Sequence, residues 1–392
     1  MTKKPLPLKS VRIRNFKAIH DSGTIGLTPL TVFVGNNGAG KSSIIEAMEF
    51  VQRMVKTDLE QAIGDWHEFA HIWNKTAPHH HGPVGNPWAT NAMSFEFSGH
   101  TGSTGYSAKS EISILLEKGG PDFKKEFVKL HRRFQRTREG SGDVEERSGG
   151  GTAKTLPPLD FYESLLSMDG HVPVDEWSFL NLNPALMGGP KKRIFERGAK
   201  MLSKSGMNLA EYLLAFYEAD KSAFNDLIDM LRMVLPFARE LRPTVVKDLI
   251  ESRIFLQMRE KGKNREFDLP SWVLSTGTLR ILALLASLRH PTLAPKVLFV
   301  DELENGLDPR TIGLLIEEIR SAVESGSTQV IATTHSPYLM DQLALKHLVL
   351  VERKPDEPPT FTRPAEDEQV QEWSRQFAPG RLYAMGTLSN RE

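Results

Sequence analysis

The sequence of 392 residues contains no cysteine, and this absence excludes several kinds of site. Without thiols the chain has no disulfides, no thiolate metal ligands and no cysteine nucleophile, which suits a reducing compartment. No run of eighteen apolar residues occurs, so the sequence predicts no transmembrane helix. Met1–Pro5 are not followed by the apolar stretch of a signal peptide. We therefore expect a cytoplasmic protein with no membrane partner.

An excess of charge of one sign is also missing. The 49 Lys and Arg residues equal the 49 Asp and Glu residues, so the whole molecule has no field that favours nucleic acid or an anionic membrane. One basic segment, Lys124–Arg138, keeps DNA binding open as a possibility. The alternative interpretation of this segment is a solvated strand face.

Dense apolar runs predict an α/β protein with a mixed central sheet. The runs are Leu30–Val34, Val297–Val300, Gln329–Thr334 and Leu348–Val351. Helical segments separate the last three runs, which is typical of parallel strands. The sequence therefore predicts a central sheet whose strands are buried.

The remaining segments differ in character and predict further parts. Three segments alternate as antiparallel strands do, Met93–Phe97, Tyr106–Glu117 and Phe123–Phe134, and residues 202–248 contain apolar residues at helical spacing. Residues 140–158, rich in Gly, Ser, Thr and charge, predict a mobile loop, and 58–90 predict a surface insertion. His79–His81, in that insertion, lack the spacing of a built metal site. We divide the chain into an N-terminal lobe (1–195), an α-helical subdomain (196–262) and a C-terminal lobe (263–392).

A glycine-rich segment between the first apolar run and a predicted helix satisfies the pattern G-x-x-x-x-G-K-[ST]. Backbone N–H groups of such a loop surround phosphates, Lys reaches the β- and γ-phosphates, and the hydroxyl binds Mg²⁺. A glycine turn that binds nothing is the alternative, but the strand before and the helix after favour the phosphate loop. The candidate phosphate-binding residues are Gly35, Asn36, Asn37, Gly38, Ala39, Gly40, Lys41, Ser42 and Ser43.

Two carboxylates follow the run Val297–Val300 directly. Asp301 emerges where ligands bind in open α/β sheets, and it is a candidate to hold Mg²⁺ with Ser42. Glu302 is a candidate to orient and deprotonate the attacking water. His335, which follows another apolar run, is a candidate to contact the γ-phosphate or the water. The alternative for Asp301 and Glu302 is a pair of acids that only end a strand at the surface. The alternative for His335 is a structural histidine.

The segment Leu274–Arg280 starts the helix that leads to Asp301. Ser275 is a good N-cap, and Gly277 permits a close backbone approach. Because a helix start with free amides and a hydroxyl attracts anions, both residues are candidates for phosphate binding. A capped helix without a ligand is the alternative.

The order of these motifs resembles the ABC-type ATPase heads, in particular the SMC/RecF/OLD-like branch of AAA-family predicted ATPases. In that resemblance Lys41 and Ser42 belong to the Walker A motif, Asp301 and Glu302 to Walker B and its catalytic glutamate, and His335 is the switch histidine. The other similar segments are the opening strand Ile13–Lys17, the signature Leu274–Thr278, the D-loop Glu304–Pro309 and the tail Trp373–Gly386. No glutamine occupies the place of the Q-loop, where this chain has residues 161–164.

The resemblance implies a P-loop NTPase fold and catalytic Lys41, Glu302 and His335, with ATP and Mg²⁺ bound between two subunits. We therefore expect a homodimer or a larger assembly of dimers, in which Ser275 and Gly277 act on the nucleotide of the partner subunit.

The biological role is predicted less directly. The long coiled coil of SMC proteins and the TOPRIM domain of OLD nucleases have no counterpart in this sequence. This favours a stand-alone ATPase that regulates a separately encoded effector, as in prokaryotic anti-phage or toxin systems. A RecF-like DNA-binding repair factor is the main alternative, and a nucleotide-dependent scaffold with negligible turnover is a third.

Overall fold

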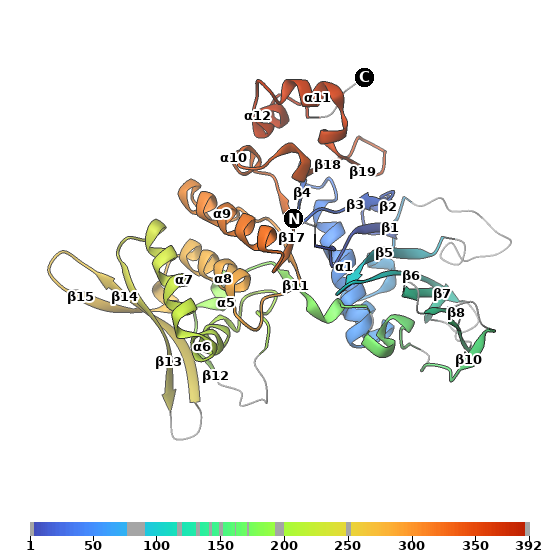
Figure 1. Ribbon diagram of the computed structural model, residues 1–392, viewed down its shortest axis with the longest axis horizontal. Helices are drawn as coiled ribbons and strands as arrows, with labels where there is room; N and C mark the ends of the chain where they lie inside the picture. Colours follow the sequence, from blue (N-terminus) through green and yellow to red (C-terminus); the bar gives the residue numbers. More distant parts are fainter. Residues whose placement is uncertain are drawn as a thin grey trace. The chain divides into compact units, whose positions relative to one another are not determined.

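The computed structural model contains two compact units (Figure 1). The first unit comprises residues 1–177 and 345–392, and the second comprises residues 178–344. The structure describes residues 4–76, 91–115, 120–130, 134–140, 143–148, 152–160, 162–170, 172–192, 200–247 and 252–388. His79–His81 lie outside these residues.

A large antiparallel sheet forms one part of the first unit, in the order β10-β9-β8-β7-β6-β5-β1-β2, with β3 also paired to β1. The alternating sequence of β1 places Val11, Ile13 and the end residue Phe16 inside. The strands are β1 (Ser10–Phe16), β2 (Ile19–Asp21), β3 (Ile25–Gly26), β5 (Met93–Thr101), β6 (Thr104–Leu115), β7 (Gly120–Leu130), β8 (Phe134–Glu139), β9 (Val144–Ser148) and β10 (Lys154–Leu156).

The expectation of a mobile loop over 140–158 is wrong for the strands β9 and β10. Val144 is fully buried, and the guanidinium of Arg136 on β8 donates to Glu146 on β9 at 2.7 Å. Alternating charges in this segment therefore pair across strands, whereas composition alone suggested a solvated loop.

The other part of the first unit carries the glycine-rich segment. β4 pairs in parallel with β18, which pairs with β19 in the antiparallel sense. On α1, Phe50 packs against Phe16 of β1 and Phe95 of β5, with ring centroids 5.9 and 5.4 Å away. The elements are β4 (Leu30–Val34), α1 (Lys41–Lys56), α2 (Leu59–Gly64), α3 (Phe69–Ile72), η1 (Leu165–Gly170), η2 (Val174–Glu176), η4 (Leu345–His347), β18 (Leu348–Glu352), β19 (Thr360–Thr362), η5 (Pro364–Glu366), α11 (Glu368–Trp373) and α12 (Pro379–Ala384).

Part of the expected surface insertion is folded. Leu59, Phe69 and Ile72 of the short helices α2 and α3 are buried, and the indole of Trp73 donates to the carbonyl of Asn91 at 3.0 Å. The segment 59–76 therefore belongs to the core of the first unit. Asp58 supplies the N-cap of α2 by accepting from the N–H of residue 61 at 2.7 Å.

The second unit combines buried parallel strands, helices and a separate antiparallel sheet. β11, β16 and β17 are neighbours in this order, β16 and β17 are parallel, and α8 is buried over most of its length. The elements are β11 (Trp177–Leu180, beginning at the last residue of the first unit), α5 (Pro184–Met187), β12 (Lys191–Lys192), α6 (Leu209–Ala219), α7 (Lys221–Val234), β13 (Ala238–Lys247), β14 (Ser252–Lys261), β15 (Glu266–Pro270), η3 (Ser271–Val273), α8 (Thr276–Arg289), β16 (Val297–Val300), α9 (Pro309–Ser325), β17 (Gln329–Thr334) and α10 (Pro337–Asp341).

Candidate functional site

The phosphate-loop residues connect β4 to α1 in the first unit. Gly35, Gly38 and Gly40 have φ angles of 155°, 76° and 104°, a region that side chains disfavour. A Cβ atom on Gly35 would lie 2.2 Å from the carbonyl oxygen of Val351, whereas a Cβ on Gly38 would meet nothing within 4 Å. The first glycine is therefore required by packing and the second by backbone conformation.

The start of α1 leaves its amides uncovered by acidic groups. Gly40 is the N-cap and offers no side-chain hydrogen bond, and the first turn contains no acidic residue. The helix dipole and the N–H groups of this turn therefore favour an anion. Asn37 is exposed and Ser42 half-buried, while Ala39 and Ser43 are buried.

Lys41 is buried at the beginning of this helix. Its ammonium donates to the carbonyl oxygens of Gly35 and Asn36 at 2.7 and 2.9 Å. A buried ammonium that is held by carbonyl groups at the loop stays within reach of a phosphate bound there.

The candidate residues Asp301 and Glu302 follow β16 in the second unit and contact the end of β17. The hydroxyl of Thr333, itself fully buried, donates to Asp301 Oδ1 at 2.7 Å and accepts the N–H of Glu302 at 2.8 Å. Thr333 thus joins the carboxylate of one residue to the backbone of the next, across 31 positions of sequence. A hydroxyl at a strand end is the only local signal of this role.

Glu302 has an unusual backbone conformation. Its φ is 51°, in the left-handed region that a non-glycine residue adopts at a cost of about 1–2 kcal/mol. Its N–H is held by Thr333, and its Oε2 accepts from the side-chain amide of Asn305 at 3.1 Å. Strain of this kind, held by surrounding hydrogen bonds, is common at functional sites.

His335 lies beside Glu304. The carboxylate oxygen Oε1 of Glu304 accepts the backbone N–H of His335 at 2.9 Å and lies 3.2 Å from Nδ1 of its ring. The other oxygen, Oε2, is buried and has no hydrogen-bond partner among the described residues. Glu304 therefore orients His335, a role that sequence reasoning missed because it treated Glu304 only as part of a loop motif.

The predicted signature residues form the start of α8. The hydroxyl of Ser275 accepts the N–H of Thr278 at 3.0 Å, as expected of an N-cap. Gly277 lies so close to the loop after Glu302 that a Cβ there would come within 2.7 Å of the carbonyl oxygen of Gly306. Ser275 itself is exposed.

Asp308 is occupied as a helix cap. Its carboxylate accepts the hydroxyl of Thr311 at 2.5 Å and the N–H groups of Arg310 and Thr311 at 2.9 and 3.2 Å. The hydroxyl contact, followed by the backbone contacts, lowers the pKa of Asp308. The carboxylate of Asp308 therefore has a structural role as the N-cap of α9.

The segment where the Q-loop was expected is fixed by a buried carboxylate. Glu126 accepts from the Ser164 hydroxyl at 2.7 Å and from the Leu165 N–H at 2.8 Å, and it pairs with Arg138 at 3.0 Å. Burial raises the pKa of Glu126, and the charge of Arg138 opposes this shift. Residue 161 lies outside the described part of the chain. We assign this cluster to the folding of the first unit.

A glutamine is present in α1, at a place that the sequence motifs did not single out. The amide of Gln52 donates to the carbonyl oxygens of Val174 and Trp177 at 2.6 and 2.8 Å. The helix that begins at Lys41 thereby holds the segment that leads out of the first unit at Trp177.

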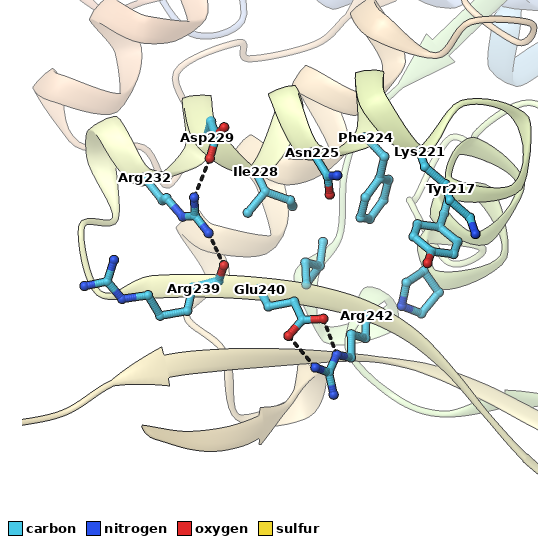
Figure 2. A pocket seen from close by; sticks show the side chains of 12 residues that line it. Tyr217, Lys221, Phe224, Asn225, Ile228, Asp229, Arg232, Arg239, Glu240 and Arg242 are labelled. Atoms are coloured by element: carbon cyan, nitrogen blue, oxygen red, sulfur yellow. Dashed lines mark hydrogen bonds and ion pairs between the residues drawn. The ribbon is translucent and has the colours of Figure 1, made fainter. Parts of the chain in front are cut away.

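A cavity of about 560 Å³ lies between α7 and β13 in the second unit (Figure 2). Arg232 donates to the carboxylate of Asp229 and to the carbonyl oxygens of Ala238 and Arg239, and Arg242 donates to Glu240. None of the predicted site residues lines this cavity. We therefore attribute its charged groups to internal pairing.

Protein side chains alone do not form a metal site in the described part of the chain. These residues contain no group of three or more His, Asp or Glu side chains that could hold a metal ion. Among the same residues, no helix is long and apolar enough to cross a bilayer.

The predicted residues thus fall into two groups, one in each unit. Gly35–Ser43 surround the start of α1 in the first unit. Asp301, Glu302 and His335 are connected in the second unit through Thr333, Glu304 and the backbone, and Gly277 packs against the same loop.

Two family models match separate segments of the chain. Residues 174–341 match the family described as "AAA domain, putative AbiEii toxin, Type IV TA system". Residues 7–77 match the family described as "AAA ATPase domain". A search of curated proteins gave no match.

Solved structures of SMC heads are similar to the chain. The SMC head bound to the C-winged helix domain of ScpA is 11% identical, with a TM-score of 0.51, covering 91% of this chain and 97% of that one. An SMC head domain from Thermotoga maritima has 14% identity and a TM-score of 0.42, covering 91% and 98%. A Smc head with an extended coiled coil from Pyrococcus furiosus, bound to the C-terminal domain of ScpA, has 10% identity and a TM-score of 0.49, covering 95% and 100%.

The fold prediction and the family resemblance are confirmed at this level. The mixed α/β architecture is shared with the SMC head, and two segments of the sequence are similar to AAA ATPase domains. The chain accordingly has the P-loop NTPase fold of the SMC head.

Proposed function

We propose that this protein binds ATP with Mg²⁺ and hydrolyses it. Its similarity to AAA ATPase domains supports ATPase activity in general. The observation that carries the specific proposal is the glycine-rich loop, in which three glycines at positive φ precede a buried lysine and a helix start with no acidic residue in its first turn. Such a loop suits a polyphosphate because N–H groups, a helix dipole and a cation converge there.

Each group of residues has a part in the proposed reaction. Lys41 neutralises charge on the β- and γ-phosphates, and the loop amides hold the phosphate chain in line for attack. The Ser42 hydroxyl and the Asp301 carboxylate supply the hard oxygen ligands that suit Mg²⁺, which would neutralise charge on the phosphates. Glu302 orients the attacking water and accepts its proton, and His335 contacts the γ-phosphate or that water.

We further propose that the active form is a homodimer, or an assembly of such dimers. The signature residues Ser275 and Gly277 then act on the nucleotide that is bound by the partner subunit. Supporting this, Ser275 and the neighbouring Trp272 and Val273 are exposed, with Trp272 52% and Val273 55% accessible. Large apolar side chains beside a helix start are typical of a surface that a partner covers.

The central test is Glu302→Gln. This substitution keeps the size of the side chain but removes the proposed base, so we expect ATP binding to persist while phosphate release falls about a hundredfold or more. Light scattering on the variant with Mg²⁺ and ATP should detect an accumulated dimer. Glu324→Gln, an exposed position on α9, is the matched control and should release phosphate at the wild-type rate. Wild-type turnover by Glu302→Gln would refute the proposed role of Glu302.

For the biological role we propose regulation of a separately encoded effector, as in prokaryotic defence or toxin systems. The description of the family matched by 174–341, which names an AbiEii toxin and a type IV toxin–antitoxin system, supports this direction. Co-expression of the chain with its neighbouring genes and purification at physiological salt tests it. A defined, nucleotide-dependent complex is expected, and a chain that purifies alone in every nucleotide state would argue against this role.

The alternative of RecF-like DNA binding has less support from the basic segment 124–138. Arg138 is 1% exposed and pairs with Glu126, and Arg136 is 10% exposed and pairs with Glu146. Arginines engaged in this way are not available to phosphates of DNA. ATPase activity that is stimulated by DNA and lost steeply with added salt would restore this alternative.

A further inference from the structure

The C-terminal part of the first unit returns to the phosphate loop at several points. The carbonyl oxygen of Val351, in β18, occupies the space beside Gly35, and Pro359 lies 3.1 Å from the position of a Cβ on Gly40. Further along the chain, the hydroxyl of Tyr383 in α12 donates to Oδ1 of Asn36 at 2.7 Å. The loop is therefore bordered by a distant part of the chain, since Asn36 and Tyr383 are 347 positions apart in sequence. The tail motif that includes Tyr383 has no role in the proposed hydrolysis.

Tyr383 is held firmly at this place. Its neighbour Leu382 is fully buried, and α12 ends directly afterwards because Gly386, at a φ of 71°, donates its N–H to the Tyr383 carbonyl oxygen at 2.9 Å. Burial, and then the charge of Glu352, raise the pKa of Tyr383. The phenol is therefore protonated at neutral pH and acts as the donor to Asn36.

Asn36 connects Tyr383 to the loop lysine. Its side-chain oxygen accepts from Tyr383, while its carbonyl oxygen accepts from Lys41 Nζ at 2.9 Å and from Ala39 N–H at 3.2 Å. Because the lysine of such a loop reaches the β- and γ-phosphates, we expect Asn36, whose carbonyl holds that lysine, to lie near the terminal phosphate of a bound nucleotide. Asn36 is otherwise exposed, so the Tyr383 hydroxyl is its side-chain anchor.

We propose that Tyr383 is a positioning residue of the nucleotide site, which holds Asn36 so that the loop closes on a nucleoside triphosphate. The inference rests on the proposed function and adds the C-terminal segment to that site. A loop held in its binding conformation loses less entropy when the ligand binds. The contribution should be larger for a triphosphate than for a diphosphate, since the anchored residue is at the γ-phosphate end.

The experiment compares Tyr383→Phe with Asn36→Ala and with the double variant. Dissociation constants are measured with Mg²⁺ and two fluorescent probes, a non-hydrolysable ATP analogue and ADP. One neutral hydrogen bond corresponds to roughly a threefold to tenfold loss of affinity, so we expect this loss for the ATP analogue and a smaller one for ADP. Because both single changes remove the same bond, the double variant should bind about as weakly as either of them.

Two reference variants make the result decisive. Tyr217→Phe, on α6 in the second unit, removes a hydroxyl from a partly exposed tyrosine and should leave both affinities unchanged. Lys41→Ala should abolish binding of the ATP analogue. A wild-type protein that does not bind the analogue refutes the proposed function, whereas a wild type that binds it and a Tyr383→Phe variant of equal affinity refute only this inference.

Folding is monitored by thermal melting of every variant. If Tyr383→Phe melts early, the affinity of Asn36→Ala decides the outcome, since this change removes the bond at an exposed loop position and leaves the phenol packed. Additive losses in the double variant would also overturn the proposal, because they would show that the two side chains act independently.

Discussion

The phosphate loop and the acidic loop after β16 are built in opposite ways. The first consists of consecutive residues whose backbone makes the site, with glycines where side chains cannot be accommodated. The second depends on side chains from two strand ends, joined by the buried hydroxyl of Thr333. A site made by backbone should fail when a side chain is added, and a site made by side chains should fail when a single polar atom is removed.

Addition of a methyl group tests the backbone-built site. In Gly35→Ala the new Cβ would come within 2.2 Å of the Val351 carbonyl oxygen, so we expect a loss of roughly 2–5 kcal/mol in the free energy of unfolding. Gly38→Ala is the matched control, because its Cβ meets nothing within 4 Å and only the positive φ opposes it, at about 1 kcal/mol. Urea denaturation measures both, and equal losses would show that the loop adapts around Gly35.

Removal of one hydroxyl tests the side-chain-built site. Thr333→Val keeps the shape of the residue but takes the acceptor from Glu302 N–H and the donor from Asp301. If Asp301 holds Mg²⁺ as proposed, we expect the catalytic constant to fall about tenfold to hundredfold, because Thr333 would then orient a metal ligand. The control is Thr333→Ser, which keeps the hydroxyl and should recover most of the rate. Equal rates for the valine and serine variants would mean that packing alone matters there.

The two units should lose stability over different ranges of acidic pH, because His290 titrates in the second unit and Asp21 in the first. Burial lowers the pKa of His290, in the second unit, to about 4 from its ordinary value of 6.5. Since the unfolded chain binds the proton more readily, stability of this unit should fall as the pH drops from 6.5 towards 4. Discounted for solvent screening, the effect is on the order of 1–2 kcal/mol.

In the first unit the sensitive range lies lower. Burial raises the pKa of Asp21, but hydrogen bonds from Arg12 and Gly23 and the nearby arginine charges hold it at about 2. That contribution is therefore lost only as the pH falls from 3.8 towards 2. Hydrogen exchange along a pH series should show peptides of α6 and α8 opening first, and His290→Asn should remove that early step. Simultaneous opening of both units would contradict this order.

The same contrast explains what the sequence could predict. The candidate phosphate loop can be proposed from the sequence because its residues are contiguous and each glycine has a local conformational or packing reason. Asp301 and Glu302 can be proposed because they end an apolar strand. The contacts of Thr333, Glu304 and Tyr383 with the candidate site residues could not be predicted, because each is a hydrogen bond to a distant residue rather than a local pattern.

Composition was a poorer guide than pairing in the antiparallel sheet. The segment 140–158 was expected to be a loop, yet Glu146 pairs with Arg136 on the adjacent strand. The helical pattern predicted over 202–248 is confirmed only from Leu209 to Val234, in α6 and α7, and β13 begins at Ala238. In both cases the strands are stabilised by neighbours that a local window of sequence does not include.

At position 302 the left-handed backbone favours glycine for stability, whereas the proposed reaction requires the carboxylate of glutamate. Glycine adopts this conformation without a Cβ clash, so a chain with glycine there would gain roughly 1 kcal/mol while losing the carboxylate. A library of variants sorted by heat resistance would therefore enrich proteins that fold better and lack the carboxylate to which we assign hydrolysis. Retention of glutamate at this position would then have to come from selection on activity, against the preference of the fold.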